Sequence, residues 1–196
     1  MRAVNYLLSG CLLIASLVGG CATHEAVDYL TLTSPTQAAV RSDAPPLSLG
    51  PVTLPDYLKR NGLARRDSNG ALRYSMSELW AEPLDQGIQR TLIEILTDAL
   101  DGTPITSFPG PSALPAHYGI SISVRRLEAT DSVAKMAVTW RILPTSSAAS
   151  TAVRRGRFSR EATLASASGP AVARALSDLL HALALEIAAE IPATDS

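Results

Sequence analysis

The chain has few of the side chains that build reactive centres. Of its 196 residues only two are cysteines and three are histidines, and aromatic residues make up 5%. None of the histidines, His24, His117 and His181, lies at metal-ligand spacing from another histidine, a cysteine or a well-placed carboxylate. The sequence also lacks a G-x-S-x-G nucleophile elbow and a phosphate-binding glycine loop. It therefore predicts no catalytic residue, no metal site and no cofactor.

An excess of charge of one sign is also missing. The chain carries 17 basic and 18 acidic side chains, for a formal net charge of −1. Such a balance creates no bulk field that would attract nucleic acid, so we predict no nucleic-acid partner. With 46% hydrophobic residues the chain can bury one ordinary core, and one domain is expected.

The apolar segment at the start of the chain is short for a membrane-spanning helix, which needs roughly 20 apolar residues. Residues 1–20 begin with a short stretch that carries Arg2, continue with an apolar run and end in small residues. This order is typical of a secretory signal. We predict a signal peptide over residues 1–20.

Both cysteines lie within or directly after this segment, and they could form a disulfide pair, a metal site or neither. The order Val18-Gly19-Gly20-Cys21 resembles a bacterial lipobox, in which the thiol after the small residues is acylated and becomes the new N-terminus. The alternative is a cleaved signal with an incidental cysteine. Cys11 fits the same local pattern but leaves only a handful of residues ahead of it for an apolar region. We therefore predict that Cys21 is the lipidated residue.

The residue after the acylated cysteine bears on the destination. By resemblance to sorted Gram-negative lipoproteins, an aspartate at this position retains a lipoprotein at the inner membrane, whereas this chain has Ala22. We expect a lipid anchor in the outer membrane, with the protein on its periplasmic face. Residues 21–26 are then a lipidated tether, and residues 27–192 form the domain.

Hydrophobic periodicity predicts the main elements of that domain. Apolar residues recur at helical spacing over residues 82–102 and 170–192. Alternation over residues 120–125 and 136–142 predicts half-buried antiparallel strands, and residues 153–164 predict a weaker third strand with Phe158 as its main apolar residue. The sum is an α+β fold, a mainly antiparallel sheet with two helices packed on one face.

Prolines and a glycine predict the position of one strand and the type of one turn. Pro51 and Pro55 favour the edge or the end of a strand over a sheet centre for the segment that begins at Leu47. Asn69-Gly70, between two short runs, predicts a tight type I′ hairpin turn.

One pattern of charge follows from the predicted strands. If the three strands are adjacent, four arginines project together with serines and threonines from the face opposite the core: Arg125, Arg141, Arg155 and Arg157. Such a pattern is typical of a solvated sheet face. The alternative is a basic docking surface for an acidic partner or for lipid headgroups.

A second candidate contact lies in the segment LPDYLKR. Tyr57, Leu58 and Arg60 follow two prolines and are expected to be exposed, outside any regular element. They are our first candidates for a partner-binding loop.

Three segments together resemble one family: LGPVTLPDYLKR (49–60), LWAEPLDQGIQRTLIEIL (79–96) and VARALSDLLHALALEIA (172–188). They are similar to the PqiC-type family of ABC-transport auxiliary lipoproteins, which also carry a lipobox, a W-A-E-P-L motif before the first helix and a central strand with a tryptophan, here Trp140. The W-A-E-P-L residues also have a purely structural interpretation, because Trp80 can be buried and Pro83 suits a first helical turn.

The resemblance implies a non-catalytic subunit of an MCE-type, Pqi-like lipid-transport system that supports the cell envelope. Its implied partners are a PqiB-like MCE-domain protein and an inner-membrane subunit, and a homo-oligomer is compatible with it. The alternative is an envelope lipoprotein that binds or assembles another component without a lipid conduit. An envelope hydrolase is disfavoured, because no nucleophile can be paired with a base.

Overall fold

The computed structural model describes residues 26–35, 40, 41, 43–110, 115–145 and 153–193. The strands are β1 (Asp28–Leu30), β2 (Leu47–Thr53), β3 (Gly62–Arg66), β4 (Leu72–Trp80), β5 (Ile105–Ser107), β6 (Tyr118–Ala129), β7 (Val133–Pro144) and β8 (Arg154–Thr163). The helices are the short 3-10 helix η1 (Asp56–Leu58) and the α-helices α2 (Leu84–Ala99) and α3 (Gly169–Glu190).

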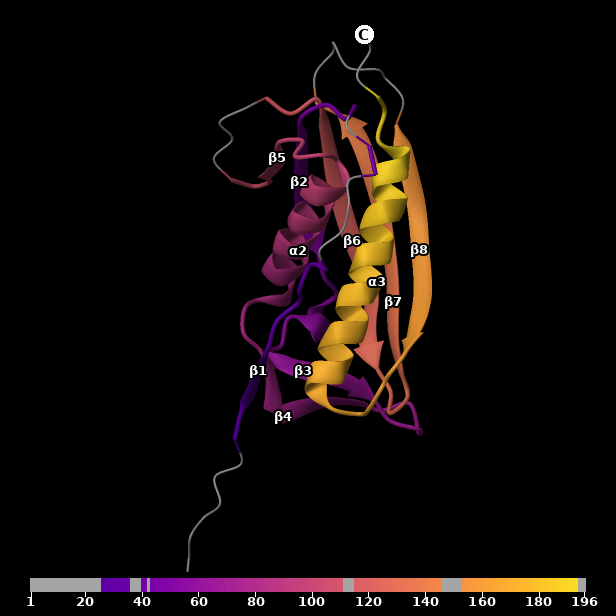
Figure 1. Ribbon diagram of the computed structural model, residues 1–196. Coiled ribbons are helices and arrows are strands. Elements are labelled where there is room, and N and C mark those ends of the chain that lie inside the picture. The colour runs from indigo at the N-terminus through magenta and orange to yellow at the C-terminus, as the bar shows by residue number, and fades with distance from the viewer. Residues whose placement is uncertain (1–25, 36–39, 42, 111–114, 146–152, 194–196) are drawn as a thin grey trace, which may run out of the picture.

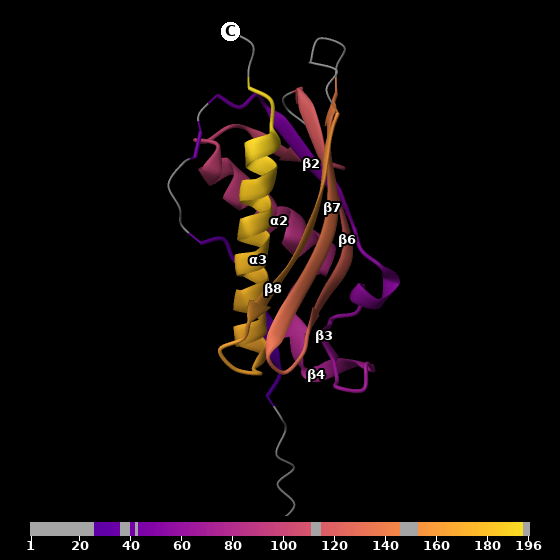
Figure 2. The ribbon, with the colours of Figure 1, turned by 90° about the vertical axis from the view of Figure 1, so that its right-hand side faces the viewer.

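The two α-helices cover one face of an eight-stranded sheet, and the opposite face of β6, β7 and β8 is open (Figures 1 and 2). The core fills the layer between helices and sheet, where Ile88, Leu92, Ile120 and Ile142 are all fully buried. The predicted α+β class, with both helices on one face, is confirmed. None of the helices in the described part of the chain combines the length and the apolar character needed to cross a membrane.

Strand β6 is the strand around which the sheet is organised. It pairs with β7 in an antiparallel ladder, and β7 pairs in the same way with β8. These long ladders confirm the predicted antiparallel core of the sheet. On its other side β6 pairs with β2 near its start and with β3 at Ala129, in parallel in both cases. The connection between β2 and β3 therefore passes beside the middle of β6.

The parallel pairings were not predicted, and they correct the position of β2. This strand lies between β5 and β6, so it is not an edge strand. Pro51 is tolerated because the ladder with β6 is interrupted between Leu49 and Val52. At such an irregularity a residue leaves the ladder, so the missing amide hydrogen of a proline costs no inter-strand hydrogen bond.

The β3–β4 hairpin also forms, but its turn differs from the predicted type. Gly70 has a positive φ of 83°, whereas Asn69 does not have the positive φ that a type I′ turn needs. The Asp67 carboxylate accepts hydrogen bonds from the backbone N–H groups of Asn69 and Ala71. A longer loop organised by an aspartate thus replaces the two-residue turn, as short polar side chains can do in turns.

Acidic side chains near the start of α2 serve both helices. Asp85 lies in the first turn of α2, as expected for a carboxylate near a helix N-terminus. Glu78 instead accepts a hydrogen bond from the first backbone N–H of α3, at Gly169, over 2.5 Å, and one from Arg65 over 3.0 Å. Because α3 has no acidic residue in its own first turn, a carboxylate from β4 supplies the negative charge there.

Candidate functional site

The four predicted arginines come together on the open side of the sheet. Arg141 on β7 lies opposite Arg155 on β8, and Arg157 lies opposite Thr139. With Arg125 of β6 they line one shallow hollow, and all four side chains are exposed. We call these four residues the arginine face. The predicted juxtaposition is confirmed, while the role of this surface in binding stays a proposal.

The arginine face has no internal charge balance. Among the described residues, none of its four guanidinium groups lies within ion-pair distance of a carboxylate. Further along the same face the pattern is different. Glu128, Lys135 and Glu161 lie side by side on β6, β7 and β8, and Lys135 pairs with Glu161 over 2.8 Å. The sheet therefore carries acidic and basic side chains in alternation near the β6–β7 turn, and an uncompensated basic area that extends from the middle of β7 toward its other end.

Strand β8 is held against β7 along its whole length, although its sequence is poor in large apolar residues. Phe158 is buried in the core. Gly156 lies opposite Trp140, and a Cβ atom at Gly156 would sit 2.3 Å from Cζ2 of the Trp140 ring. The indole covers the position that a side chain would occupy. This packing accounts for the pairing of a strand that the sequence predicted only weakly.

The second predicted surface is corrected by the structure. Asp56–Leu58 form a turn of 3-10 helix, and Leu58 is buried, with 3% of its surface exposed. Leu58 is therefore part of the core and not a partner contact. Tyr57 is half-buried, and Arg60 is exposed, with its guanidinium 4.9 Å from the centroid of the Tyr74 ring. The sequence did not predict this burial, because it depends on the pairing of β2 and β3 with different parts of β6, which places the segment between them beside that strand.

A buried carboxylate that sequence reasoning missed lies under this segment. Glu128 is 3% exposed, and Arg66 binds it with two nitrogens, Nε to Oε1 over 2.9 Å and Nη2 to Oε2 over 2.8 Å. Arg126 adds a longer ion pair of 3.5 Å. Two-nitrogen pairing of this kind provides the compensation that a buried charge needs. The sequence signal was slight, because Glu128 stands between two core residues of β6.

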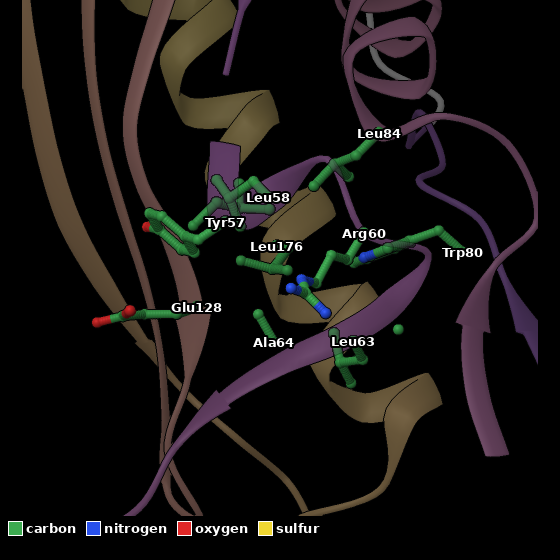
Figure 3. Close-up of a pocket in the computed structure, with 11 residues that line it drawn as sticks. Tyr57, Leu58, Arg60, Leu63, Ala64, Trp80, Leu84, Glu128 and Leu176 are labelled. Atoms are coloured by element: carbon green, nitrogen blue, oxygen red, sulfur yellow. The ribbon is translucent and has the colours of Figure 1, made fainter. Parts of the chain in front are cut away.

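Tyr57, Glu128 and Leu58 share the lining of a small cavity with residues of β3 and α3 (Figure 3). The cavity encloses about 10 Å³, which is at the lower limit for a single water molecule. It is a packing feature between the strands and α3, and it offers no room for a small-molecule ligand.

The environment of Tyr57 makes the stability of the fold sensitive to alkaline pH. Burial, followed by the negative charge of Glu128, raises the pKa of the Tyr57 hydroxyl above its ordinary value of 10.0. The neutral phenol is thus favoured in the folded state. The contribution of the neutral phenol to stability is complete below the pKa that Tyr57 has in the unfolded chain. This contribution is lost as pH rises through the higher pKa that Tyr57 has in the folded protein.

We expect a Tyr57→Phe variant to lose less of its free energy of unfolding than the wild type between about pH 9 and about pH 11, because it has no phenol to ionise. Urea denaturation of both proteins at the two pH values measures the difference. Tyr29→Phe is the matched control, since Tyr29 is 69% exposed. Equal losses in the wild type and in Tyr57→Phe would contradict the effect of Tyr57.

Cys21 lies outside the described residues, so its predicted lipidation stays a prediction. Within residues 26–35, 40, 41, 43–110, 115–145 and 153–193, no group of three or more histidine, cysteine or acidic side chains could hold a metal ion.

Comparison with known proteins places this fold. The family model of the ABC-type transport auxiliary lipoprotein component matches residues 30–188. The Intermembrane transport lipoprotein PqiC of Escherichia coli strain K12 is 35% identical over 105 residues, which cover 51% of this chain and 56% of that protein. PqiC of Shigella flexneri matches with the same values. The matched region thus spans about half the length of these curated relatives.

Solved structures support the same architecture. The crystal structure of an uncharacterized protein superposes with a TM-score of 0.68 at 22% sequence identity, covering 86% of this chain and 100% of the other. A Xanthomonas campestris protein superposes with a TM-score of 0.59 at 18% identity, covering 84% and 91%. At these identities the likeness concerns the fold. Because the family model extends over most of the chain, from β1 to the last turn of α3, the chain belongs to the family of ABC-type transport auxiliary lipoprotein components.

Proposed function

We propose that this chain is a non-catalytic, lipid-anchored outer-membrane subunit of an MCE-type, Pqi-like intermembrane lipid transport system that supports the integrity of the cell envelope. The observation that carries the proposal is the family match over residues 30–188, strengthened by 35% identity to a protein whose name is intermembrane transport lipoprotein. An auxiliary component assists a transporter, and it needs no reactive centre of its own.

The proposed organisation of the chain follows from its start. Residues 1–20 direct export and are removed, Cys21 carries the acyl chains, residues 21–26 form the tether, and residues 27–192 form the domain. Two or more acyl chains anchor a protein stably where a single chain does not. Ala22 favours the outer membrane, with the domain on the periplasmic side.

The proposed partners are a PqiB-like MCE-domain protein and an inner-membrane subunit of the same system, and a homo-oligomer is compatible with this role. Arg60 is the part of the 57–60 segment that we keep as a candidate partner contact, because it is exposed. Tyr57 is a secondary candidate, since its half-buried ring also supports the fold.

Co-purification tests the proposal. The full-length chain, tagged at its C-terminus and extracted from native envelopes with a mild detergent, is expected to bring down an MCE-domain protein identified by mass spectrometry. An unrelated lipoprotein with the same tag and anchor is the control, because it reports recovery caused by a shared membrane alone.

Each outcome of that experiment is informative. Recovery of the MCE-domain protein with this chain, but not with the control, supports the transport role. Recovery of a different envelope component, with no MCE-domain protein under several mild detergents, would instead favour the role of a binding or assembly factor without a conduit.

A further inference from the structure

We propose that the arginine face is a docking surface for an acidic, extended segment of a partner protein, with apolar contacts supplied by Leu143 and Val153 at its end. The inference goes beyond the proposed function, because it concerns the chemistry of one surface and applies to any protein partner of the chain.

The charge distribution on the sheet is the first argument. Arg141 and Arg155 are direct cross-strand neighbours, and like charges in this position destabilise a sheet. The same three strands place acidic and basic side chains in alternation in the row of Glu128, Lys135 and Glu161. The uncompensated positive charge is thus confined to one area of the face. Carboxylates from outside the domain would neutralise it.

Exposed apolar side chains adjoin the arginines. Leu143 follows Arg141 by two residues on β7, so it lies on the same face, and it is 39% exposed. Val153 precedes Arg155 by two residues and is 55% exposed. Arginine next to apolar surface is a frequent composition of protein contact sites, in which the apolar part contributes affinity and the charges contribute orientation.

The spacing of the arginines fits an extended chain. Arg155 and Arg157 are separated by one residue on β8, so their side chains leave the same face about 7 Å apart along the strand. Carboxylates at alternate positions of an extended peptide have the same spacing. Each guanidinium can bind a carboxylate through two nitrogens, which gives both strength and direction to the contact.

The position of the face relative to the tether favours a protein over the headgroups of the anchoring membrane. β1 begins at the end of the molecule where the β6–β7 turn lies, as both ribbon views show (Figures 1 and 2). Arg141 is eight residues along β7 from Val133, a distance of about 26 Å from that end. A five-residue tether from Cys21 to Ala26 spans at most about 18 Å. Arg141 and its cross-strand neighbour Arg155 therefore lie farther from that end of the domain than the length of the tether, whereas Arg157 lies opposite Thr139, near the middle of β7.

The test uses the full-length lipidated chain in neutral detergent micelles. The probe is a fluorescein-labelled synthetic peptide with glutamate at alternate positions and leucine at one end, and the comparison peptide has lysine in place of glutamate. Fluorescence anisotropy is measured from about 50 mM to about 500 mM salt, because exposed charge contacts are screened over this range.

We expect Arg155→Glu combined with Arg157→Glu to weaken binding of the acidic peptide at least about 10-fold at low salt and to remove most of its salt dependence. The fold should be retained, since Arg155→Glu replaces a like-charge pair with Arg141 by an opposite-charge pair. The matched control is Arg154→Glu combined with Arg174→Glu. This control makes the same change in net charge at two exposed arginines outside the arginine face: Arg154 on the helix-bearing face of β8 and Arg174 on α3. Its affinity for the acidic peptide should stay within about twofold of the wild-type value.

A second variant tests the apolar part. Leu143→Ser combined with Val153→Ser should weaken the peptide several-fold without changing the slope of affinity against salt. Equal affinity of the wild type and Arg155→Glu/Arg157→Glu would overturn the proposal. A competition experiment gives a second way to overturn it, in which phosphatidylglycerol or the unlabelled acidic peptide is added to the micelles to displace the labelled peptide. If phosphatidylglycerol displaces the labelled peptide at a lower concentration of negative charge than the unlabelled peptide does, lipid headgroups are the preferred occupant and the proposal is wrong.

Discussion

Cys21→Ala is expected to abolish acylation of the chain and to release the exported protein from the membrane. The acyl chains are the predicted anchor, and each buried methylene contributes about 0.8 kcal/mol to membrane binding, so two chains hold a protein that the domain itself would not hold. Incorporation of labelled palmitate and sedimentation of membranes measure the two effects. The wild type should be labelled and sediment, whereas the variant should do neither.

Cys11→Ala is the matched control, because it removes the other cysteine of the chain. It should keep both the label and the membrane association, provided that export is unaffected. Loss of label in Cys11→Ala alone, with full labelling of Cys21→Ala, would show that the lipidated residue has been misassigned. Retention of the Cys21→Ala protein on membranes without label would show that a different contact holds it there.

Leu92→Ala is expected to lower the free energy of unfolding by about 2–5 kcal/mol. Leu92 is fully buried on the face of α2 that packs against the sheet, together with Ile88, Ile95 and Leu96. Truncation to alanine removes apolar contacts and leaves a cavity that neighbours from two layers can fill only in part. Chemical denaturation followed by circular dichroism measures the loss.

Gln86→Ala is the matched control on the same helix, since Gln86 is exposed and the change leaves the core intact. It should alter the free energy of unfolding by no more than about 0.5 kcal/mol. A similar small effect in both variants would mean that α2 does not form the described layer against the sheet.

The class of the fold was readable from local sequence pattern. The helical stripe that includes Ile88 and Leu92 and the alternation from Ile120 onward each specify an element with one apolar face. Two such helices and several such strands can bury these faces together only as layers. The same alternation predicted which side of the sheet would carry Arg125, Arg141, Arg155 and Arg157, because side chains on a strand point alternately to opposite faces.

Pairing between distant strands was not readable in the same way. β2 pairs with the first half of β6, and β3 pairs with its end. The segment Asp56–Leu58 between these two strands therefore lies against Glu128, and Leu58, which the sequence predicts to be exposed, is buried in the core. Pro51 could enter a central strand because the ladder is irregular there. Glu78 reached the start of α3 across 91 positions of sequence.

The physical reason for this difference is the range of the interactions involved. Periodicity arises from backbone geometry within a few residues, so it is present in any local window of sequence. Burial of Leu58, pairing of Glu128 with Arg66 and the packing of Trp140 over Gly156 depend on segments that meet only after the chain has folded. Which strands become neighbours is set by the total free energy of the packed layers, to which every segment contributes, so no short stretch of sequence contains it.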